Sequence, residues 1–171
     1  MLFLGQHDYE RAVADFSRAI HLTPNDLGAY ASRAYAYAKQ GDRGRAFADA
    51  TEAIKLKSTE MPLGRFVDLD LRARAYTIIG QPGLALRDFR EAVRLMPNYS
   101  TPNGNLAWFL ATCPEDRFRN GMEAVSAAKR ACEVSQWKSF GCHDTLAVAY
   151  AEAGDFDELS NMRNRHSTIL R

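Results

Sequence analysis

Apolar positions along the chain recur at the helical spacing of three and four residues, and the whole pattern returns after 34 residues or more. Three segments share one arrangement of small and large apolar residues: "HDYERAVADFSRAIHLTP" (7–24), "GDRGRAFADATEAIKLKS" (41–58) and "GQPGLALRDFREAVRLMP" (80–97). Their alignment, extended to a fourth segment, gives columns of Ala12, Ala46, Ala85 and Ala124, of Ala19, Ala53, Ala92 and Ala131, and of Ile20, Ile54, Val93 and Cys132. This periodicity predicts an amphipathic helix in each repeat.

A second helical pattern precedes these segments. The stretches "GAYASRAYAYAKQG", "DLDLRARAYTIIG" and "DTLAVAYAEAG" align on three columns, which hold Ala34, Ala73 and Ala147, then Tyr37, Tyr76 and Tyr150, then Gly41, Gly80 and Gly154. The glycines stand where a helix C-terminus needs a left-handed residue. No alternation of period two is present, so no sheet is expected. The pattern predicts an all-α chain of helix–turn–helix repeats, with alanines where antiparallel helices approach closely.

These columns resemble the tetratricopeptide repeat, whose motif runs Trp, Leu-Gly, Tyr, then Ala, Phe, Ala, Pro. The resemblance covers nearly the whole chain, although the motif tryptophan is missing and alanine replaces glycine at Ala34, Ala73 and Ala147. It implies a right-handed α-solenoid of stacked antiparallel helix pairs, in one domain over 1–171. The expected repeats are a truncated first repeat and four further ones, with the last carrying a C-terminal cap: 1–26, 27–60, 66–99, 100–138 and 140–171.

The stretch "LAWFLATCPEDRFRNG" (106–121) departs from the regular spacing. Ala107 and Ala124 are 17 residues apart, where Ala34 and Ala46 are 12 apart, so five residues are added between the two helices. Pro114 disfavours helical geometry at the residue before it, which predicts that the helix ends at Cys113. The stretch resembles a lengthened turn in a group of bacterial tetratricopeptide proteins. Within it, Phe118 either anchors a partner or folds back against the helix ends.

The three cysteines offer little chemistry. Their irregular spacing does not predict a disulfide framework, and none of the four histidines stands at motif spacing to Cys113. Cys132 fits its apolar column as a small buried residue, and Cys142-His143 lacks the further ligands of a structural zinc site. We therefore expect no catalytic residue, no metal and no cofactor, a near-silent Cys142→Ser substitution, and a reducing, cytoplasmic setting.

The resemblance also implies a binding surface. In the family, the first helices of successive repeats line a concave groove that receives a peptide or partner helix. The groove positions carried over to this chain are Tyr35, Lys39, Asp70, Arg74, Asn105, Trp108 and Asp144. Tyr, Arg and Trp are the residue types that most often carry binding energy at interfaces. The alternative is that Arg74 stacks between Tyr35 and Trp108 as an internal cation–π ladder.

Charge and hydropathy narrow the partner classes. The net charge is +1, from 22 basic and 21 acidic residues, without the basic stripe of a nucleic-acid-binding protein. The longest apolar run, about eight residues from Leu106, is far shorter than a membrane span, and "MLFLG" lacks the features of a signal peptide. The family's chaperone-tail clamp is not matched, because its positions hold Ala31, Tyr35, Leu71, Thr101 and Asn105 in one register and Asp70, Arg74, Asn105, Gly141 and Thr145 in the other.

The two ends of the chain differ. The helix at 8–21 has a complete apolar face, but the segment before it, "MLFLGQ", is too short to form a stable partner helix. This edge is therefore expected to continue upstream of Met1 or to self-associate, whereas Leu159, Arg163 and His166 suggest a terminal cap. The sequence favours a non-catalytic scaffold that binds a protein segment. The alternatives are a detached C-terminal part of a larger multidomain protein and an RNA-binding helical repeat.

Overall fold

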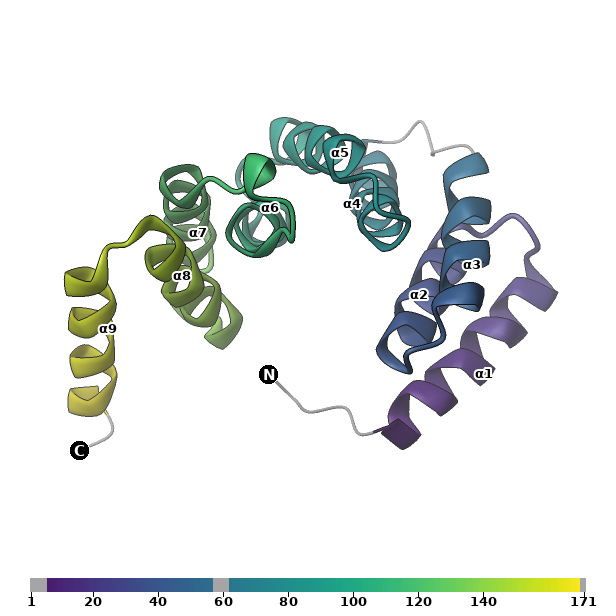
Figure 1. Cartoon of the computed structure of the whole chain (residues 1–171), viewed down its shortest axis with the longest axis horizontal. Helices are drawn as coiled ribbons and strands as arrows, with labels where there is room; N and C mark the ends of the chain where they lie inside the picture. The colour runs from purple at the N-terminus through teal and green to yellow at the C-terminus, as the bar shows by residue number, and fades with distance from the viewer. Residues whose placement is uncertain (1–5, 57–61, 170–171) are drawn as a thin grey trace. The chain divides into compact units, whose positions relative to one another are not determined.

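The computed structural model describes residues 6–56 and 62–169, and over these residues the chain is helical with no strand (Figure 1). A short 3-10 turn, η1, spans Asp116–Phe118 between α6 and α7. The helices are α1 (Gln6–Leu22), α2 (Leu27–Lys39), α3 (Arg43–Lys55), α4 (Pro62–Ile78), α5 (Pro82–Leu95), α6 (Ser100–Thr112), α7 (Gly121–Val134), α8 (Phe140–Ala153) and α9 (Phe156–Ile169). The all-α architecture predicted from the sequence is confirmed.

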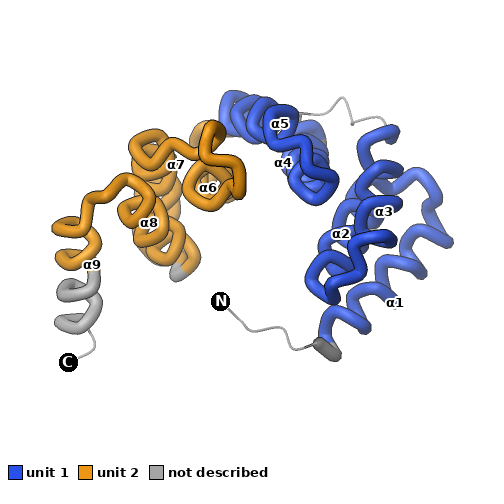
Figure 2. Tube along the Cα trace, viewed as in Figure 1, with its two compact units in different colours: residues 1–95 blue, residues 96–171 orange. Residues whose placement is uncertain are grey.

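The chain forms two compact units, residues 1–95 and 96–171, coloured separately in Figure 2. In the N-terminal unit, α2 packs against α1, α3 and α4, and α4 packs against α3 and α5. In the C-terminal unit, α6 and α7 form a pair, α8 packs against both, and α9 packs against α8. Helices that are neighbours in the sequence are therefore neighbours in each unit, as expected when each repeat buries its apolar face against the next.

The alanine columns are buried where paired helices pack against each other. Ala34 and Ala46 are buried between α2 and α3, and the equivalent residues of the next two pairs are buried as well: Ala73, Ala85, Ala107 and Ala124. A methyl group at these positions lets two helix backbones approach closely, with larger side chains packing beside the contact. The last pair differs, because Ala147 is only half-buried and Ala149 is the fully buried alanine of α8.

The turns within the repeats use the predicted glycines. Gly41, Gly80 and Gly154 have φ values of +81°, +72° and +71°, in the left-handed region that glycine adopts without a steric penalty. The turn between α7 and α8 reaches the same region without glycine, at Gln136 and Trp137, whose φ values are +53° and +58°. Residues with a Cβ are strained there, so this turn needs support from its surroundings.

A further glycine marks a close approach that the columns do not reveal. A Cβ atom on Gly121, the first residue of α7, would overlap the backbone of Glu152 and Ala153 at the end of α8. Glycine is therefore needed at this position so that the two helix ends can touch.

The lengthened connection in the fourth repeat is folded onto the C-terminal unit. Helix α6 ends at Thr112 with Cys113 as its cap residue, as predicted from Pro114. The guanidinium of Arg119 lies 2.8 Å from Asp116 and 2.9 Å from Glu152 of α8, and it donates to the Cys113 carbonyl at 3.2 Å. Half-buried Phe118 lies beneath Arg117, at 4.7 Å from the ring centroid to the guanidinium carbon. The half-burial of Phe118 agrees with the alternative in which this side chain folds back.

The chain ends are described only in part. The stub residues 1–5 lie outside the described residues, as do the side chains from residue 163 onward, which include Arg163 and His166 of the expected cap. Helix α1 shows a face that is less covered than its counterparts. Ala12 and Ala19 are half-buried, whereas the matching Ala46 and Ala53 of α3 are buried.

Candidate functional site

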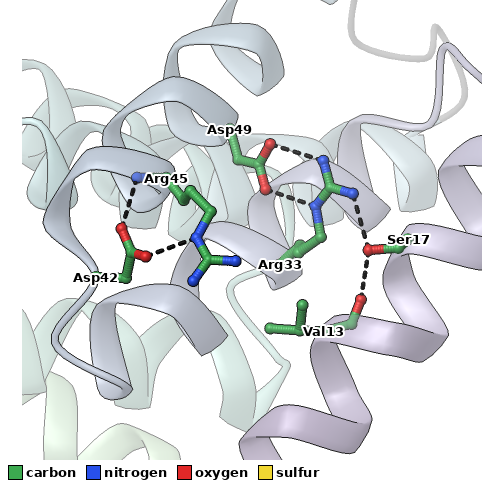
Figure 3. Close-up of polar contacts among 6 residues, drawn as sticks. All are labelled: Val13, Ser17, Arg33, Asp42, Arg45 and Asp49. Carbon is green, nitrogen blue, oxygen red and sulfur yellow. Dashed lines mark hydrogen bonds and ion pairs between the residues drawn. The ribbon is translucent and has the colours of Figure 1, made fainter.

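A partly buried arginine–aspartate pair joins the two helices of the second repeat, α2 and α3, and its arginine also reaches α1 of the first repeat (Figure 3). The Nε of Arg33 on α2 donates to Asp49 of α3 at 2.6 Å, and its Nη2 donates to the other carboxylate oxygen at 2.8 Å. Its Nη1 donates to the Ser17 hydroxyl of α1 at 3.0 Å. The hydrogen bond from Asp49 raises the pKa of Arg33 above its ordinary value, although burial acts in the opposite direction. One side chain thus links three helices.

The same pair recurs in the next repeat. Arg72 of α4 donates to Asp88 of α5 at 2.6 Å, and Arg87 donates to the other oxygen of Asp88 at 3.1 Å. The hydrogen bond to Asp88 raises the pKa of Arg72 above its ordinary value. Both pairs have a spacing of 16 residues. Neither pair is among the residues predicted from the sequence, although an Arg and an Asp at the same spacing in two repeats indicate such a pair.

Four of the predicted groove residues lie in the N-terminal unit and form two local pairs. The Tyr35 side chain on α2 is 41% exposed, and the Lys39 ammonium lies 5.3 Å from its ring centroid. On α4, Arg74 forms an ion pair of 3.0 Å with buried Asp70. Among the described contacts, the cation over the Tyr35 ring is Lys39. Arg74, which the alternative placed between Tyr35 and Trp108, pairs with Asp70 on its own helix. These pairs leave one face of Tyr35 and part of Arg74 open to solvent.

The C-terminal unit brings two predicted residues together around a hollow of about 330 Å³. Asn105 and Trp108 of α6 line it, and Thr145 of α8 lies opposite. The Trp108 side chain is 43% exposed, so the ring is available to a partner. The remaining lining residues are small or polar: Ser100, Thr101, Gly104, Ala131, Ser139, Gly141 and Cys142. Asp144, the other predicted residue of this unit, is exposed on α8 and does not line the hollow.

A disulfide bond borders this hollow and corrects the interpretation of the cysteines. Cys132 at the end of α7 is bonded to Cys142 at the start of α8, with a Cα–Cα distance of 5.2 Å. Cys132 is buried in its apolar column as expected, but Cys142 is its covalent partner rather than an isolated residue. The spacing of the two residues in the sequence does not predict the bond, because the bond depends on the tight turn between α7 and α8.

The remaining cysteine shows no site chemistry. Cys113 is a buried free thiol, and among the described residues no group of three or more His, Cys, Asp or Glu side chains could hold a metal ion. What the site offers is contact area and hydrogen bonding: a partly exposed indole, an amide and a hydroxyl around one hollow.

A sequence profile described as tetratricopeptide repeat matches residues 27–60, which cover α2 and α3. Residues 27–60 form a tetratricopeptide repeat. Solved structures agree with this assignment at the level of the fold. A putative kinesin light chain from Podospora anserina with nearly identical TPR-like repeats aligns with a TM-score of 0.65 and 17% identity, over 95% of this chain and 87% of that one. The α-solenoid class predicted from the sequence is thereby confirmed.

Two other similar proteins bear on function. YrrB, a tetratricopeptide protein with an unusual peptide-binding site, aligns with a TM-score of 0.54 and 19% identity, over 91% of this chain and 75% of that one. Serine/threonine-protein phosphatase 5 of Rattus norvegicus is 35% identical over 91 residues, which are 53% of this chain. The match spans only 17% of the phosphatase. Among the described residues, no helix is both long and apolar enough to cross a membrane.

Proposed function

We propose that this tetratricopeptide chain is a non-catalytic scaffold that binds a peptide or helix of a partner protein on the first helices of its repeats. The observation that carries the proposal is the hollow of the C-terminal unit, where Asn105, Trp108 and Thr145 surround about 330 Å³. A partly exposed tryptophan beside polar groups is a typical anchor, because the ring supplies apolar area and the polar groups fix the register of the bound chain. The peptide-binding site of structurally similar YrrB supports the same use of the fold.

The N-terminal unit supplies further contacts in this proposal. The exposed face of Tyr35 offers a ring to an apolar side chain, and Lys39 beside it favours an acidic group. Arg74 retains donors beyond its pair with Asp70, since a guanidinium carries five N–H groups. On α8, exposed Asp144 offers a carboxylate. We also propose that the chain consists of five repeats and that the fourth repeat contains the lengthened connection.

The alternatives differ in what supports them. The match to 17% of a phosphatase is weak support for a detached segment of a larger protein. Self-association is supported by the half-buried face of α1, which carries Phe16 and Ile20 beside Ala12 and Ala19. Light scattering over a range of protein concentrations measures it directly. RNA binding is opposed by a net charge of +1, and a salt-dependent complex with random RNA would support it.

Trp108→Ala is expected to weaken partner binding by about 2 kcal/mol or more, roughly a thirtyfold rise in Kd. The reason is that the change removes the largest side chain of the hollow. The measurement is isothermal titration with a peptide selected on the wild-type chain from a random peptide library. Trp137→Ala is the matched control, because Trp137 is 49% exposed in the same unit but does not line the hollow.

Both variants are checked for an unchanged helical circular dichroism spectrum before binding is compared. Wild-type affinity in Trp108→Ala, together with a large loss in Trp137→Ala, would place the binding surface elsewhere.

A further inference from the structure

A second hollow lies on the N-terminal unit, and its lining shares no residue with the proposed peptide site. It measures about 590 Å³ and is formed by one face of α4 and one face of α5. Leu69 and Leu86 contribute its apolar part, and the remaining lining is almost entirely charged. Five of its residues are arginines, namely Arg65, Arg72, Arg87, Arg90 and Arg94. The only carboxylates among its described lining residues are Asp88 and Glu91.

Positive charge is therefore in excess within this arginine groove. Among the described lining residues, five guanidinium groups face two carboxylates, a surplus of three charges in a chain whose total net charge is +1, and Asp68 acts on Arg72 from outside the lining. The surplus must be balanced over the rest of the molecule by a net negative charge of two. Such a separation concentrates a positive potential in one groove and attracts anionic groups to it.

Ion pairs hold three of the arginines, Arg72, Arg87 and Arg94, without using all of their donors. Asp88, whose side chain is 2% exposed, accepts from both Arg72 and Arg87. Glu91 accepts two hydrogen bonds of 2.7 Å from Arg94. Since each guanidinium has five N–H donors, such pairs leave several donors available. The side chains of Arg87 and Arg94 are 61% and 69% exposed, so these donors reach solvent.

The spacing of the arginines suits an elongated ligand. Arg87, Arg90 and Arg94 recur at three and four residues along α5, and Arg65 and Arg72 flank the groove from α4. The α5 stripe is about 10 Å long at 1.5 Å per residue. An extended peptide covers this length with about three residues, and it places two side chains of one face about 7 Å apart. Successive carboxylates of an acidic segment can therefore meet successive guanidinium groups.

The lining residues also favour an acidic peptide over a nucleic acid as the ligand. Proteins that bind single-stranded RNA combine positive charge with aromatic side chains on which the bases stack. The described lining residues of the arginine groove include leucine and glycine but no aromatic residue. Planar guanidinium groups match carboxylates in a bidentate geometry, which Arg94 already adopts with Glu91.

We propose that the arginine groove of α4 and α5 is a docking site for an acidic, Glu- or Asp-rich segment of a protein partner. This surface combines α4 with α5, and its lining includes none of the residues of the proposed peptide site, which on α4 are Asp70 and Arg74. A partner can then contact the chain at two places, with an anchor at Trp108 and an acidic stretch at the arginines. A substitution at one of these two contacts is therefore expected to leave binding at the other contact unchanged.

The test uses a fluorescein-labelled decaglutamate peptide and fluorescence anisotropy at an ionic strength of about 0.1 M. The wild-type chain is expected to bind it saturably, and added salt weakens the complex because the contacts are ionic. The double variant Arg87→Glu/Arg90→Glu is expected to bind about tenfold or more weakly, since two guanidinium donors are replaced by repelling carboxylates. Arg87→Gln/Arg90→Gln, which removes charge without adding repulsion, is expected to lose a smaller part of the affinity.

The matched control is Arg43→Glu/Lys55→Glu, which makes the same change in net charge on exposed residues of α3. It is expected to change the affinity by about twofold or less, because general attraction falls off within a Debye length of ~10 Å. Trp108→Ala is expected to bind decaglutamate like the wild type. Absence of saturable binding, an equal loss in the α3 control, or tighter binding of labelled decauridylate RNA than of decaglutamate would each overturn the proposal.

Discussion

Replacing Asp88 by alanine is expected to lower the free energy of unfolding by about 3 kcal/mol, because it leaves a partly buried guanidinium without its carboxylate. Asp88 is almost fully buried and accepts from Arg72 at 2.6 Å. In the folded state of the variant, Arg72 keeps the desolvation cost of its position but loses the interaction that offset it. Urea unfolding followed by circular dichroism measures the change.

Two further variants separate the buried pair from general charge effects. Glu52→Ala removes an exposed ion pair with Lys55, and we expect it to cost less than about 1 kcal/mol. Arg72→Met/Asp88→Ala removes both partners of the buried pair, so it should be more stable than Asp88→Ala alone. If Asp88→Ala costs no more than Glu52→Ala, the buried pair does not stabilise the N-terminal unit.

Loss of the Cys132–Cys142 bond is expected to be the second largest effect, at about 2–3 kcal/mol. The bond closes a loop with a sequence separation of 10 residues, and it spans the turn in which Gln136 and Trp137 adopt left-handed backbone angles. Without the bond, the unfolded chain gains entropy and the strained turn loses its support. Cys132→Ala and Cys142→Ala are therefore expected to have similar costs, measured by urea unfolding under non-reducing conditions.

The bond is identified by the stability costs of the two single cysteine variants, which should not add up in the double variant. The double variant Cys132→Ala/Cys142→Ala should be no less stable than the worse of the two single variants, because both remove the same covalent link. Cys113→Ala is the control, since its thiol is buried but free. In the denatured wild-type protein, one of the three thiols should react with a thiol reagent until a reductant is added. Three reactive thiols without reductant would show that the bond is not formed.

Much of the fold could be predicted from local periodicity. Ala34, Ala73 and Ala107 were predicted to lie at helix contacts from the columns alone, and each is fully buried. Gly41 and Gly80 were predicted to end helices, and both have positive φ values. These features depend on residues within one repeat and on the requirement that neighbouring helices bury their apolar faces, so the sequence pattern carries them.

Features that depend on the path of the chain between helices were harder to predict. The bond between Cys132 and Cys142 requires a turn through non-glycine residues in the left-handed region, for which the sequence has no clear signal. Asp70 was predicted as a groove residue from its position, but position alone did not reveal its burial or its pair with Arg74. The arginine groove was missed because its members come from two helices and become a cluster only when α4 and α5 pack.

The central claim, that the hollow around Trp108 binds a partner segment, is tested most directly by the two indole N–H signals of the chain. In a nitrogen–proton correlation spectrum, Trp108 and Trp137 give separate signals, which their alanine variants assign. On titration with the library-selected peptide, the Trp108 signal is expected to shift and saturate at the stoichiometry found by calorimetry, while the Trp137 signal stays in place. A peptide that binds with the Trp108 signal unmoved would contradict the account.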